Sequence, residues 1–324
     1  MEYRKLGQTE LKISEIGFGS WGIGGVTPGS NSYGPTRDTT SIEALNTAFE
    51  NGINFFDTSN IYGLGHSEKL IGQTFQSKRK NVLYATKLGM SDFTTHIHFN
   101  TYTMNKSLDD SLIRLKTDYV DLLQLHNIPI DILIENPTII ETLKNFKKQG
   151  KAREIGLSLQ NPYDLFKIMS VFDIKVFQLN LNLLDMRLLN NKHFKKLRQS
   201  SIGIIARTPF CFGFLINNFS KDHKFDISDH RNNWSKNQQL EWIENAKKIF
   251  SALKIDNNNI NKKILTALRF CLTVPMVSSV LPGMLTKEEV LNNIQASKLG
   301  NLSPETYNKT IKIYNELETD VKKN

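Results

Sequence analysis

Short apolar runs rich in β-branched residues alternate along the chain with stretches whose apolar residues recur at helical spacing. Eight such runs, each ending in turn or polar residues, predict strands at residues 16–20, 53–58, 82–87, 120–126, 154–158, 176–180, 203–207 and 276–281. Amphipathic spacing predicts helices at residues 40–49, 107–115, 139–148, 163–172 and 193–199. Alternating strands and helices form parallel sheets, and eight such units favour closure into a barrel. We therefore expect an α/β fold, a (β/α)8 TIM barrel.

Three segments depart from this alternation. Residues 3–13 carry Gly7 in a candidate turn and predict a short N-terminal β-hairpin that caps the bottom of the barrel. The polar stretch 217–239 is too long for an ordinary strand-to-helix connection, so it is a candidate functional loop. Ser303 and Pro304 have the character of an N-cap and a first-turn proline, which predicts a final helix.

The composition is that of an ordinary globular protein. The 324 residues contain no Pro-, Gly- or Ser-rich linker, so we expect one domain over residues 1–324 rather than two of about 150 residues. Cys211 and Cys271 cannot form a disulfide framework, and nothing near them resembles a metal site. No apolar stretch approaches the length of a membrane span and the first residues lack the apolar core of a signal peptide, so we expect a cytoplasmic protein with no membrane partner.

The charge balance is basic, with 41 Lys and Arg against 32 Asp and Glu and a formal net charge of +9. Nucleic-acid binding is therefore an alternative to be weighed. However, the basic residues are scattered, and short clusters such as residues 78–80 are typical of a solvated face. We expect no nucleic-acid partner, and a basic surface would also suit an anionic cofactor or substrate.

Three of the predicted strands end on ionisable residues. They end on Asp57, Lys87 and His126, and a glycine-broken loop after the first of them carries Tyr62. Taken alone, each residue has a structural explanation, such as a plain salt bridge or a histidine bonded to a backbone group. Active sites of parallel barrels lie at the carboxyl ends of the strands, where a charge has little structural use. The four residues together therefore predict a catalytic site.

These residue types suit the reduction of a carbonyl group by a nicotinamide. The reaction needs a proton donor at the developing alkoxide, and a tyrosine can serve if a lysine ammonium lowers its pKa from about 10. A carboxylate keeps the lysine charged and in place, and a histidine can hydrogen-bond the carbonyl oxygen and orient it. We predict that Asp57, Tyr62, Lys87 and His126 are catalytic and that Tyr62 is the proton donor.

Gly17, Gly19 and Gly22 match the G-x-G-x-x-G pattern of a dinucleotide-binding fold. That pattern functions only where its last glycine opens a helix whose N-terminus meets the pyrophosphate. The glycines and prolines of residues 25–35 cannot form such a helix. We therefore interpret the three glycines as a tight loop after the first barrel strand.

Three segments resemble signatures of the aldo-keto reductase family, namely residues 56–68, 107–126 and 150–158. The resemblance runs from about residue 3 to residue 296. It implies a (β/α)8 barrel that binds NADP(H) without a dinucleotide-binding fold and reduces a small aldehyde, ketone or sugar-like carbonyl substrate. It places Asp57, Tyr62, Lys87 and His126 on the catalytic tetrad of the family, with Tyr62 as the acid/base.

The resemblance also implies a set of cofactor contacts. Gly19, Ser20 and Trp21 match the loop beside the nicotinamide, and Ser158 and Gln178 match the polar pair that holds its carboxamide. The full set along the chain is Gly19, Ser20, Trp21, Asp57, Ser158, Gln178, Arg207, Thr208, Pro209, Phe210, Gly213, Arg231, Gly283, Glu289, Asn292 and Asn293.

Several of these positions depart from the family pattern. Leu159 stands where the family usually has asparagine, and Arg207 stands where an aromatic ring often lies on the nicotinamide. Glu289 replaces the arginine or glutamine that faces the adenosine 2′-phosphate, and it would repel a phosphate unless Lys287 or Arg231 supplies compensating charge. We expect NADP(H) as the cofactor, with NAD(H) as an alternative.

Two other functions are compatible with these residues. One is a barrel that binds the cofactor but acts as a regulatory subunit with little turnover, as the potassium-channel β subunits of the family do. The other is a basic, partner-binding barrel without enzymatic activity. Oxidation of the reduced cofactor on addition of a reactive aldehyde separates both from the predicted reductase.

Overall fold

The computed structural model describes residues 1–27, 29, 31–92, 95–189, 194–220 and 222–317. An eight-stranded parallel sheet runs in sequence order from β3 to β10. Its strands are β3 (Phe18–Gly19), β4 (Phe55–Asp57), β5 (Leu83–Leu88), β6 (Val120–His126), β7 (Ala152–Ser158), β8 (Val176–Asn180), β9 (Gly203–Arg207) and β10 (Val277–Leu281). Parallel bridges from Ile16 to Val280 and from Gly19 to Gly283 join the first and last strands. The expected (β/α)8 barrel is confirmed.

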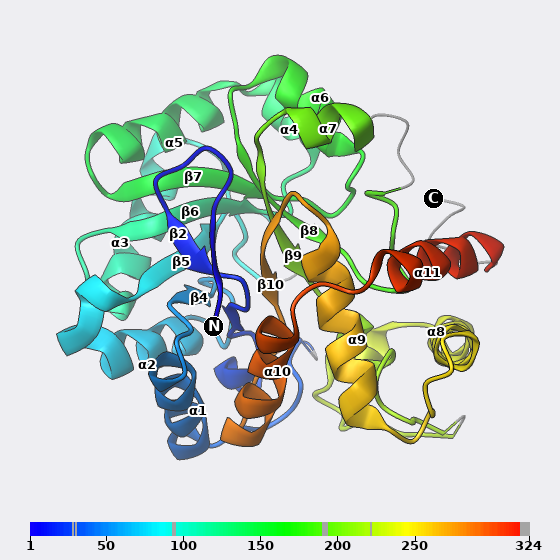
Figure 1. Cartoon of the computed structure of the whole chain (residues 1–324). Coiled ribbons are helices and arrows are strands. Elements are labelled where there is room, and N and C mark those ends of the chain that lie inside the picture. The colour runs from blue at the N-terminus through cyan, green and yellow to red at the C-terminus, as the bar shows by residue number, and fades with distance from the viewer. Residues whose placement is uncertain (28, 30, 93–94, 190–193, 221, 318–324) are drawn as a thin grey trace.

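Helices surround the strands of this barrel (Figure 1). They are α1 (Asp38–Glu50), α2 (His66–Phe75), α3 (Thr101–Leu115), α4 (Ile130–Glu135), α5 (Thr138–Lys148), α6 (Asp164–Val171), α7 (Phe194–Gln199), α8 (Lys236–Ala252), α9 (Ile260–Thr273), α10 (Lys287–Leu299) and α11 (Pro304–Glu316). Five of them, α1, α3, α5, α6 and α7, lie where helices were predicted, although residue 193 of the last prediction is outside the described residues. The final helix begins at Pro304 after Ser303, as expected.

Local sequence explains why α3 forms where it does. The Asn100 side chain accepts a hydrogen bond from the backbone of Thr103, whose hydroxyl in turn accepts one from the backbone of Asn100. This reciprocal pair satisfies two backbone donors that a helix start otherwise leaves unpaired. Met104, Leu108 and Leu115 recur at helical spacing and are buried. The capped start and the apolar face together fix α3 against the barrel.

The N-terminal hairpin closes the bottom of the barrel, as predicted. Its strands β1 (Tyr3–Lys5) and β2 (Lys12–Ser14) pair antiparallel. Leu6, in the turn, is fully buried in an apolar cluster with inward-facing residues of the barrel strands. Gly7 has a φ of +57°, and a Cβ there would lie 2.4 Å from the backbone nitrogen of Gly203 at the start of β9. Only glycine permits this close approach of the hairpin to the strand ends.

Helices α2, α4, α8, α9 and α10 were not predicted. Within α2, Gly72 interrupts the pattern, because glycine has a low helix propensity. A Cβ on Gly72 would lie 2.5 Å from the carbonyl oxygen of Arg114 at the end of α3. Gly72 therefore makes α2 hard to predict from the sequence, and it also allows α2 to pack closely on α3.

The polar stretch 217–239 is only partly a loop. Its last four residues belong to α8, and a short 3-10 helix, η4 (His230–Asn233), lies within it. The stretch also pairs with another loop, because residues Ser32 and Asp229 form a parallel bridge. The predicted boundary is therefore wrong at its C-terminal end, because α8 begins at Lys236 and the loop ends at residue 235.

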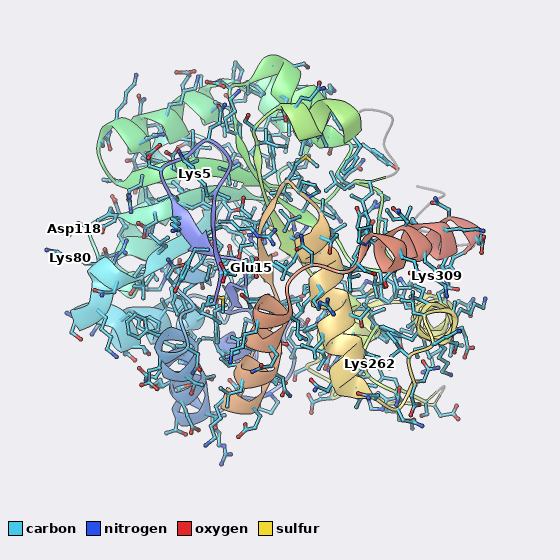
Figure 2. The ribbon with its side chains drawn as sticks, viewed as in Figure 1. Lys5, Glu15, Lys80, Asp118, Lys262 and Lys309 are labelled. Atoms are coloured by element: carbon cyan, nitrogen blue, oxygen red, sulfur yellow. The ribbon has the colours of Figure 1, made fainter. Side chains whose placement is uncertain are left out.

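Basic side chains are dispersed over the surface. Figure 2 shows Lys80, Lys262 and Lys309 well apart in this view, on η2 (Gln76–Asn81), α9 and α11 respectively. Among the described residues, no helix has both the length and the apolar character needed to cross a bilayer.

Candidate active site

The barrel brings the four predicted catalytic residues to one end. Asp57 is the last residue of β4, Lys87 is next to last in β5, and His126 is the last residue of β6. Tyr62 lies in the turn that follows β4 and precedes α2. Because these are the carboxyl ends of neighbouring parallel strands, the three strand-borne side chains share one mouth of the barrel.

Lys87 is fully buried and makes an ion pair with Asp57. Its Nζ also donates to the carbonyl oxygen of Thr58 at 2.8 Å and lies 3.4 Å from the hydroxyl of Tyr62. Burial alone would lower the pKa of Lys87, but the negative charge of Asp57 outweighs it and leaves the pKa above its ordinary value. Lys87 is therefore an ammonium group held beside the tyrosine hydroxyl.

Two amide side chains hold the other oxygen of Asp57. Its Oδ2 accepts hydrogen bonds from Gln124 Nε2 at 3.1 Å and from Gln178 Nε2 at 2.8 Å. The role of Gln124 was not predicted, although its position in the sequence could have indicated that it belongs to the site. It is a polar residue in an otherwise apolar strand, two positions before His126, and side chains two apart on a strand point to the same face. The carboxylate is thus fixed at both oxygens.

His126 is buried and neutral. Burial lowers its pKa well below the usual value, and the positive charges of Lys87 and Arg207 lower it further. Its Nδ1 lies 3.0 Å from the hydroxyl of Ser59, a buried residue that was not predicted to belong to the site. The ring centre is 5.9 Å from that of Tyr62. With Nδ1 engaged by Ser59, Nε2 is the nitrogen left for a substrate.

An aromatic wall stands beside the tyrosine. Trp21, in the turn after β3, stacks on Tyr62 with ring centres 6.1 Å apart and planes 26° apart. The loop 217–235 brings His230 to within 4.3 Å of the Trp21 ring, centre to centre. Trp234, from the same loop, lies 5.1 Å from the His230 ring. This loop therefore contributes rings to the same end of the barrel as the four charged or polar residues.

Arg207 is anchored at the ends of the central strands. Its Nη2 donates to Asn127 Oδ1 and to the carbonyl oxygen of Leu159, each at 3.1 Å. The hydroxyl of Ser158 lies 3.5 Å from the same Asn127 oxygen. Asn127, directly after β6, was not predicted. It connects Arg207 and Ser158, two of the residues that the sequence assigned to the nicotinamide.

Two of the predicted cofactor residues carry buried nitrogens with no hydrogen-bond partner among the described residues. They are Nε of Arg207 and Nδ2 of Asn293, on β9 and α10. Leaving a buried polar group unpaired costs about 1–3 kcal/mol. At Gly283, an added Cβ would meet no atom within 4 Å, so there is open space beside the end of β10. These features fit a bound polar ligand such as a nicotinamide nucleotide.

The remaining predicted contacts lie in the loops after β3 and β9. The hydroxyl of Ser20 donates to the carbonyl oxygen of Asp57 at 2.7 Å, so it supports the catalytic strand. Thr208 donates to Asn180 Oδ1 at 2.9 Å. Gly19, the last residue of β3, also belongs to this part of the set. Pro209, Phe210 and Gly213 complete it after β9, and Gly213 ends the short 3-10 helix η3 (Cys211–Gly213).

Arg231, a predicted source of positive charge, is already paired. Its Nε donates to Asp229 Oδ1 at 2.9 Å, and its Nη2 donates to Oδ2 of the same carboxylate at 2.5 Å. The guanidinium also lies over the ring of Phe225, 4.3 Å from its centre. Its Nη1 nevertheless remains near the η3 loop, since a Cβ on Gly213 would lie 3.5 Å from it.

The charged residues at the start of α10 are engaged as well. Lys287 makes an ion pair with Glu43 at 2.9 Å, and both side chains are solvent-exposed. The carboxylate of Glu289 accepts a hydrogen bond from the backbone of Leu285 at 2.6 Å. Asn292 is exposed one turn further along the helix. Glu289 is therefore held at the helix N-terminus, and Lys287 is directed to another partner.

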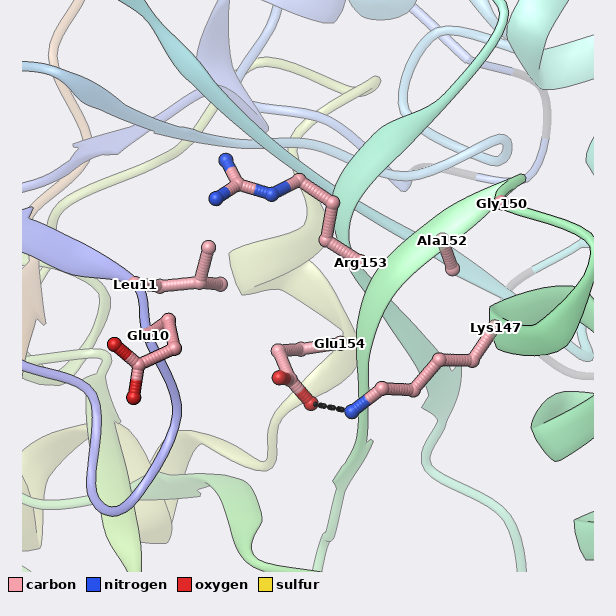
Figure 3. Close-up of a pocket in the computed structure, with 7 residues that line it drawn as sticks. All are labelled: Glu10, Leu11, Lys147, Gly150, Ala152, Arg153 and Glu154. Carbon is pink, nitrogen blue, oxygen red and sulfur yellow. Dashed lines mark hydrogen bonds and ion pairs between the residues drawn. The ribbon is translucent and has the colours of Figure 1, made fainter.

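A surface hollow of about 370 Å³ lies at the opposite end, between the hairpin and the start of β7 (Figure 3). Charged side chains that line this hollow form ion pairs. Lys147 pairs with Glu154 at 2.5 Å, as drawn in the figure, and Arg153 pairs with the buried Asp121 at 2.8 Å. None of the four predicted catalytic residues lines this hollow. The four predicted catalytic residues therefore lie away from this hollow, at the other end of the barrel.

A closed parallel barrel with a buried lysine–carboxylate pair beside a tyrosine is the architecture of a barrel oxidoreductase. The model of the Aldo/keto reductase family matches residues 15–315, so the chain belongs to this family of oxidoreductases acting on carbonyl and alcohol groups. The chain is 31% identical over 311 residues to the L-galactose dehydrogenase of Arabidopsis thaliana, covering 91% of this chain and 88% of that protein.

Two further comparisons agree with this assignment. The chain is 28% identical over 264 residues to the aldo-keto reductase yakc [NADP(+)] of Schizosaccharomyces pombe, covering 79% of this chain and 75% of that one. The holo form of the aldo-keto reductase AKR11C1 from Bacillus halodurans superposes with a TM-score of 0.79 at 23% identity, over 99% of this chain and 98% of that one. The family resemblance drawn from the sequence is confirmed.

Proposed function

We propose that the protein, acting as one domain over residues 1–324, reduces an aldehyde, ketone or sugar-like carbonyl to an alcohol with a reduced nicotinamide nucleotide. The single observation that carries this proposal is the hydroxyl of Tyr62 lying 3.4 Å from the buried ammonium of Lys87. A phenol beside a fixed positive charge can release a proton, because the charge stabilises the phenolate that remains. The neutral His126 meets the tyrosine ring edge-on, with the ring centres 5.9 Å apart.

In this reaction, the bound nicotinamide supplies a hydride to the carbonyl carbon. Tyr62 donates its proton to the carbonyl oxygen, so that the carbon gains a hydride and the oxygen a proton. Lys87 stabilises the resulting tyrosinate, and Asp57 keeps Lys87 charged and in position. His126 donates from Nε2 to the carbonyl oxygen and orients it. These groups are in place before the substrate binds, which is how polar groups contribute most to catalysis.

Several residues would hold the cofactor. Ser158, the last residue of β7, and Gln178, in the middle of β8, would face the carboxamide. Arg207 Nε and Asn293 Nδ2 are the buried nitrogens available to donate to it, at the nicotinamide and adenine sides respectively. The glycine backbone at Gly213 and the open space at Gly283 suit the phosphates between them.

We propose further that the preference for NADP(H) over NAD(H) is weak, within about tenfold, or roughly 1.4 kcal/mol. Glu289 supports this proposal, because a carboxylate accepts from a free ribose hydroxyl and repels a 2′-phosphate. Neither nearby cation is free to offset it, since Lys287 is paired with Glu43 and Arg231 with Asp229. Among the relatives, yakc carries NADP(+) in its name.

The cofactor proposal is tested with Glu289→Arg, which should shift the ratio of dissociation constants towards NADP(H). Both cofactors would be measured for wild type and variant at one salt concentration. Glu288→Arg is a matched control, because it makes the same charge change one residue away on the exposed face of α10. A wild-type preference for NADP(H) above a hundredfold, unchanged by Glu289→Arg, would place Glu289 away from the phosphate.

The catalytic proposal is tested with Tyr62→Phe. This variant should lose carbonyl reduction and keep its affinity for the cofactor, because the hydroxyl acts only where alkoxide charge develops. Turnover is followed by cofactor oxidation with a series of aldehydes. A variant that retains a tenth or more of wild-type turnover would refute the role of Tyr62. A wild type that binds the cofactor but does not oxidise it with any of the aldehydes would support the regulatory barrel instead.

A further inference from the structure

His230 lies in η4 at the catalytic end of the barrel and is surrounded by aromatic rings. Ring centres lie at 4.3 Å for Trp21, 4.5 Å for Tyr33 and 5.1 Å for Trp234. Trp21 in turn stacks on Tyr62. Only one ring therefore separates His230 from the proposed proton donor.

The imidazole of His230 is buried, with 5% of the residue exposed, and its Nε2 has no hydrogen-bond partner among the described residues. The backbone nitrogen of His230 does have a partner, the carbonyl oxygen of Ser32 at 2.8 Å. An unpaired buried nitrogen lowers stability, and a phenylalanine would fill the same aromatic surroundings without that cost. The position thus retains a polar atom to which no described residue bonds.

The surroundings favour a neutral ligand group at this nitrogen. Burial lowers the pKa of His230 to about 4, with opposing smaller effects of Asp229 and Arg231, so the ring is uncharged at neutral pH. The charge of the adjacent Arg231 is compensated by an ion pair with Asp229, to which its side chain makes three hydrogen bonds. An anionic group would therefore meet a neutral imidazole here. A hydroxyl can both donate and accept, so it matches Nε2 in either tautomer.

We propose that Nε2 of His230 hydrogen-bonds a hydroxyl group of a hydroxylated aldehyde or ketone, whose carbonyl oxygen lies at Tyr62 and His126. His230 is then a specificity-determining residue of the substrate site. This inference rests on the proposed carbonyl reduction, and it narrows the substrate class to neutral hydroxylated carbonyls.

The test compares glyceraldehyde with propanal, which has the same three-carbon chain without the hydroxyls, at concentrations corrected for hydration of the aldehydes. The wild type should prefer glyceraldehyde in kcat/KM. In His230→Phe this preference should fall about tenfold, the effect of one neutral hydrogen bond, mostly through KM. Propanal should be reduced as before. His230→Gln, which keeps a hydrogen-bonding group, should restore part of the preference.

His223→Phe is the matched control, since His223 is an exposed histidine of the same loop that packs on Phe219 and Phe225. It should leave the preference unchanged. An unchanged preference in His230→Phe, an equal loss for both aldehydes, or a wild type that prefers propanal would overturn the inference. If His230→Phe does not fold, the inference is tested by the preference for glyceraldehyde over propanal in the wild type and in His230→Gln. A wild type that reduces neither aldehyde would instead contradict the proposed reductase function, and the inference would fall with it.

Discussion

Replacing Lys87 by methionine should both destabilise the protein and abolish turnover. Lys87 is fully buried, and the side chain of its partner Asp57 is 4% exposed, so neither charge is solvated in the folded state. Two unit charges about 4 Å apart at an effective dielectric constant of about 20 attract by about 4 kcal/mol. Removing one partner of a buried pair typically costs about 3–5 kcal/mol, because the other charge stays buried and unpaired.

The hydrogen bonds around Asp57 place the cost at the lower end of that range. Gln124 and Gln178 still donate to Oδ2 in the variant, so only Oδ1 loses its partner. The carbonyl oxygen of Thr58 also loses the donor that it has in the wild type. We expect the free energy of unfolding to fall by about 3 kcal/mol.

A second substitution separates the stability effect from the catalytic one. In Asp57→Asn/Lys87→Met both charges are removed, and a buried neutral amide with one unmet hydrogen bond costs only about 1–3 kcal/mol. The double variant should therefore be more stable than Lys87→Met. Its turnover should remain at least about a hundredfold below wild type, because the ammonium that stabilises the tyrosinate of Tyr62 is still absent.

Urea unfolding followed by circular dichroism gives the stabilities, and cofactor oxidation with an aldehyde gives the turnover. Two results would contradict the reasoning about stability. One is a Lys87→Met variant within 1 kcal/mol of wild type, and the other is a double variant less stable than the single one. Wild-type turnover in either variant would show that Lys87 is a bystander in the reaction.

Two further predictions concern the buried histidines. Ser59→Ala should lower kcat about tenfold without changing cofactor affinity, because His126 loses the 3.0 Å contact at Nδ1 that fixes its tautomer; an unchanged kcat would refute this role. The second concerns acid stability: the pKa of His230 is lowered from 6.5 to about 4 in the folded state, so the unfolded chain binds a proton first as the pH falls. Compared with His230→Phe, the wild type should lose about 1.4 kcal/mol of unfolding free energy per pH unit between about pH 6.5 and about pH 4, and parallel pH profiles would disprove it.

The positions of the proposed catalytic residues in the fold could be predicted from the sequence, because ionisable residues stand at the ends of apolar strand-like runs. Strand periodicity placed Asp57, Lys87 and His126 at strand ends, and parallel strands bring those ends together. The side chains that support them were harder to predict. Ser59 is one small polar residue in a turn, and its contact with His126 depends on the path of the chain after β4, which no local pattern specifies.

The parts of the fold that escaped prediction share a physical cause. Helix propensity and periodicity are local properties. The need for glycine at position 72 of α2 instead comes from the close approach of α3, which is distant in sequence. The loop 217–235 was recognised by its length, but not the partner that it contacts. Its bridge from Asp229 to Ser32 joins segments almost 200 residues apart, so its role beside Trp21 appears only in three dimensions.

Polar groups at the catalytic end are satisfied in two different ways. The charged groups of Lys87 and Asp57 find their partners within the protein, which fixes their geometry before any ligand binds. By contrast, Nε of Arg207, Nε2 of His230 and Nδ2 of Asn293 have no hydrogen-bond partner among the described residues, and they lie on three separate elements, β9, η4 and α10. Each unpaired nitrogen lowers the stability of the free protein by about 1–3 kcal/mol, and a ligand that supplies its partner removes that loss. The Lys87–Asp57 pair is therefore fixed in the free protein. A ligand that bonds to the unpaired nitrogens should in turn raise the stability of the barrel.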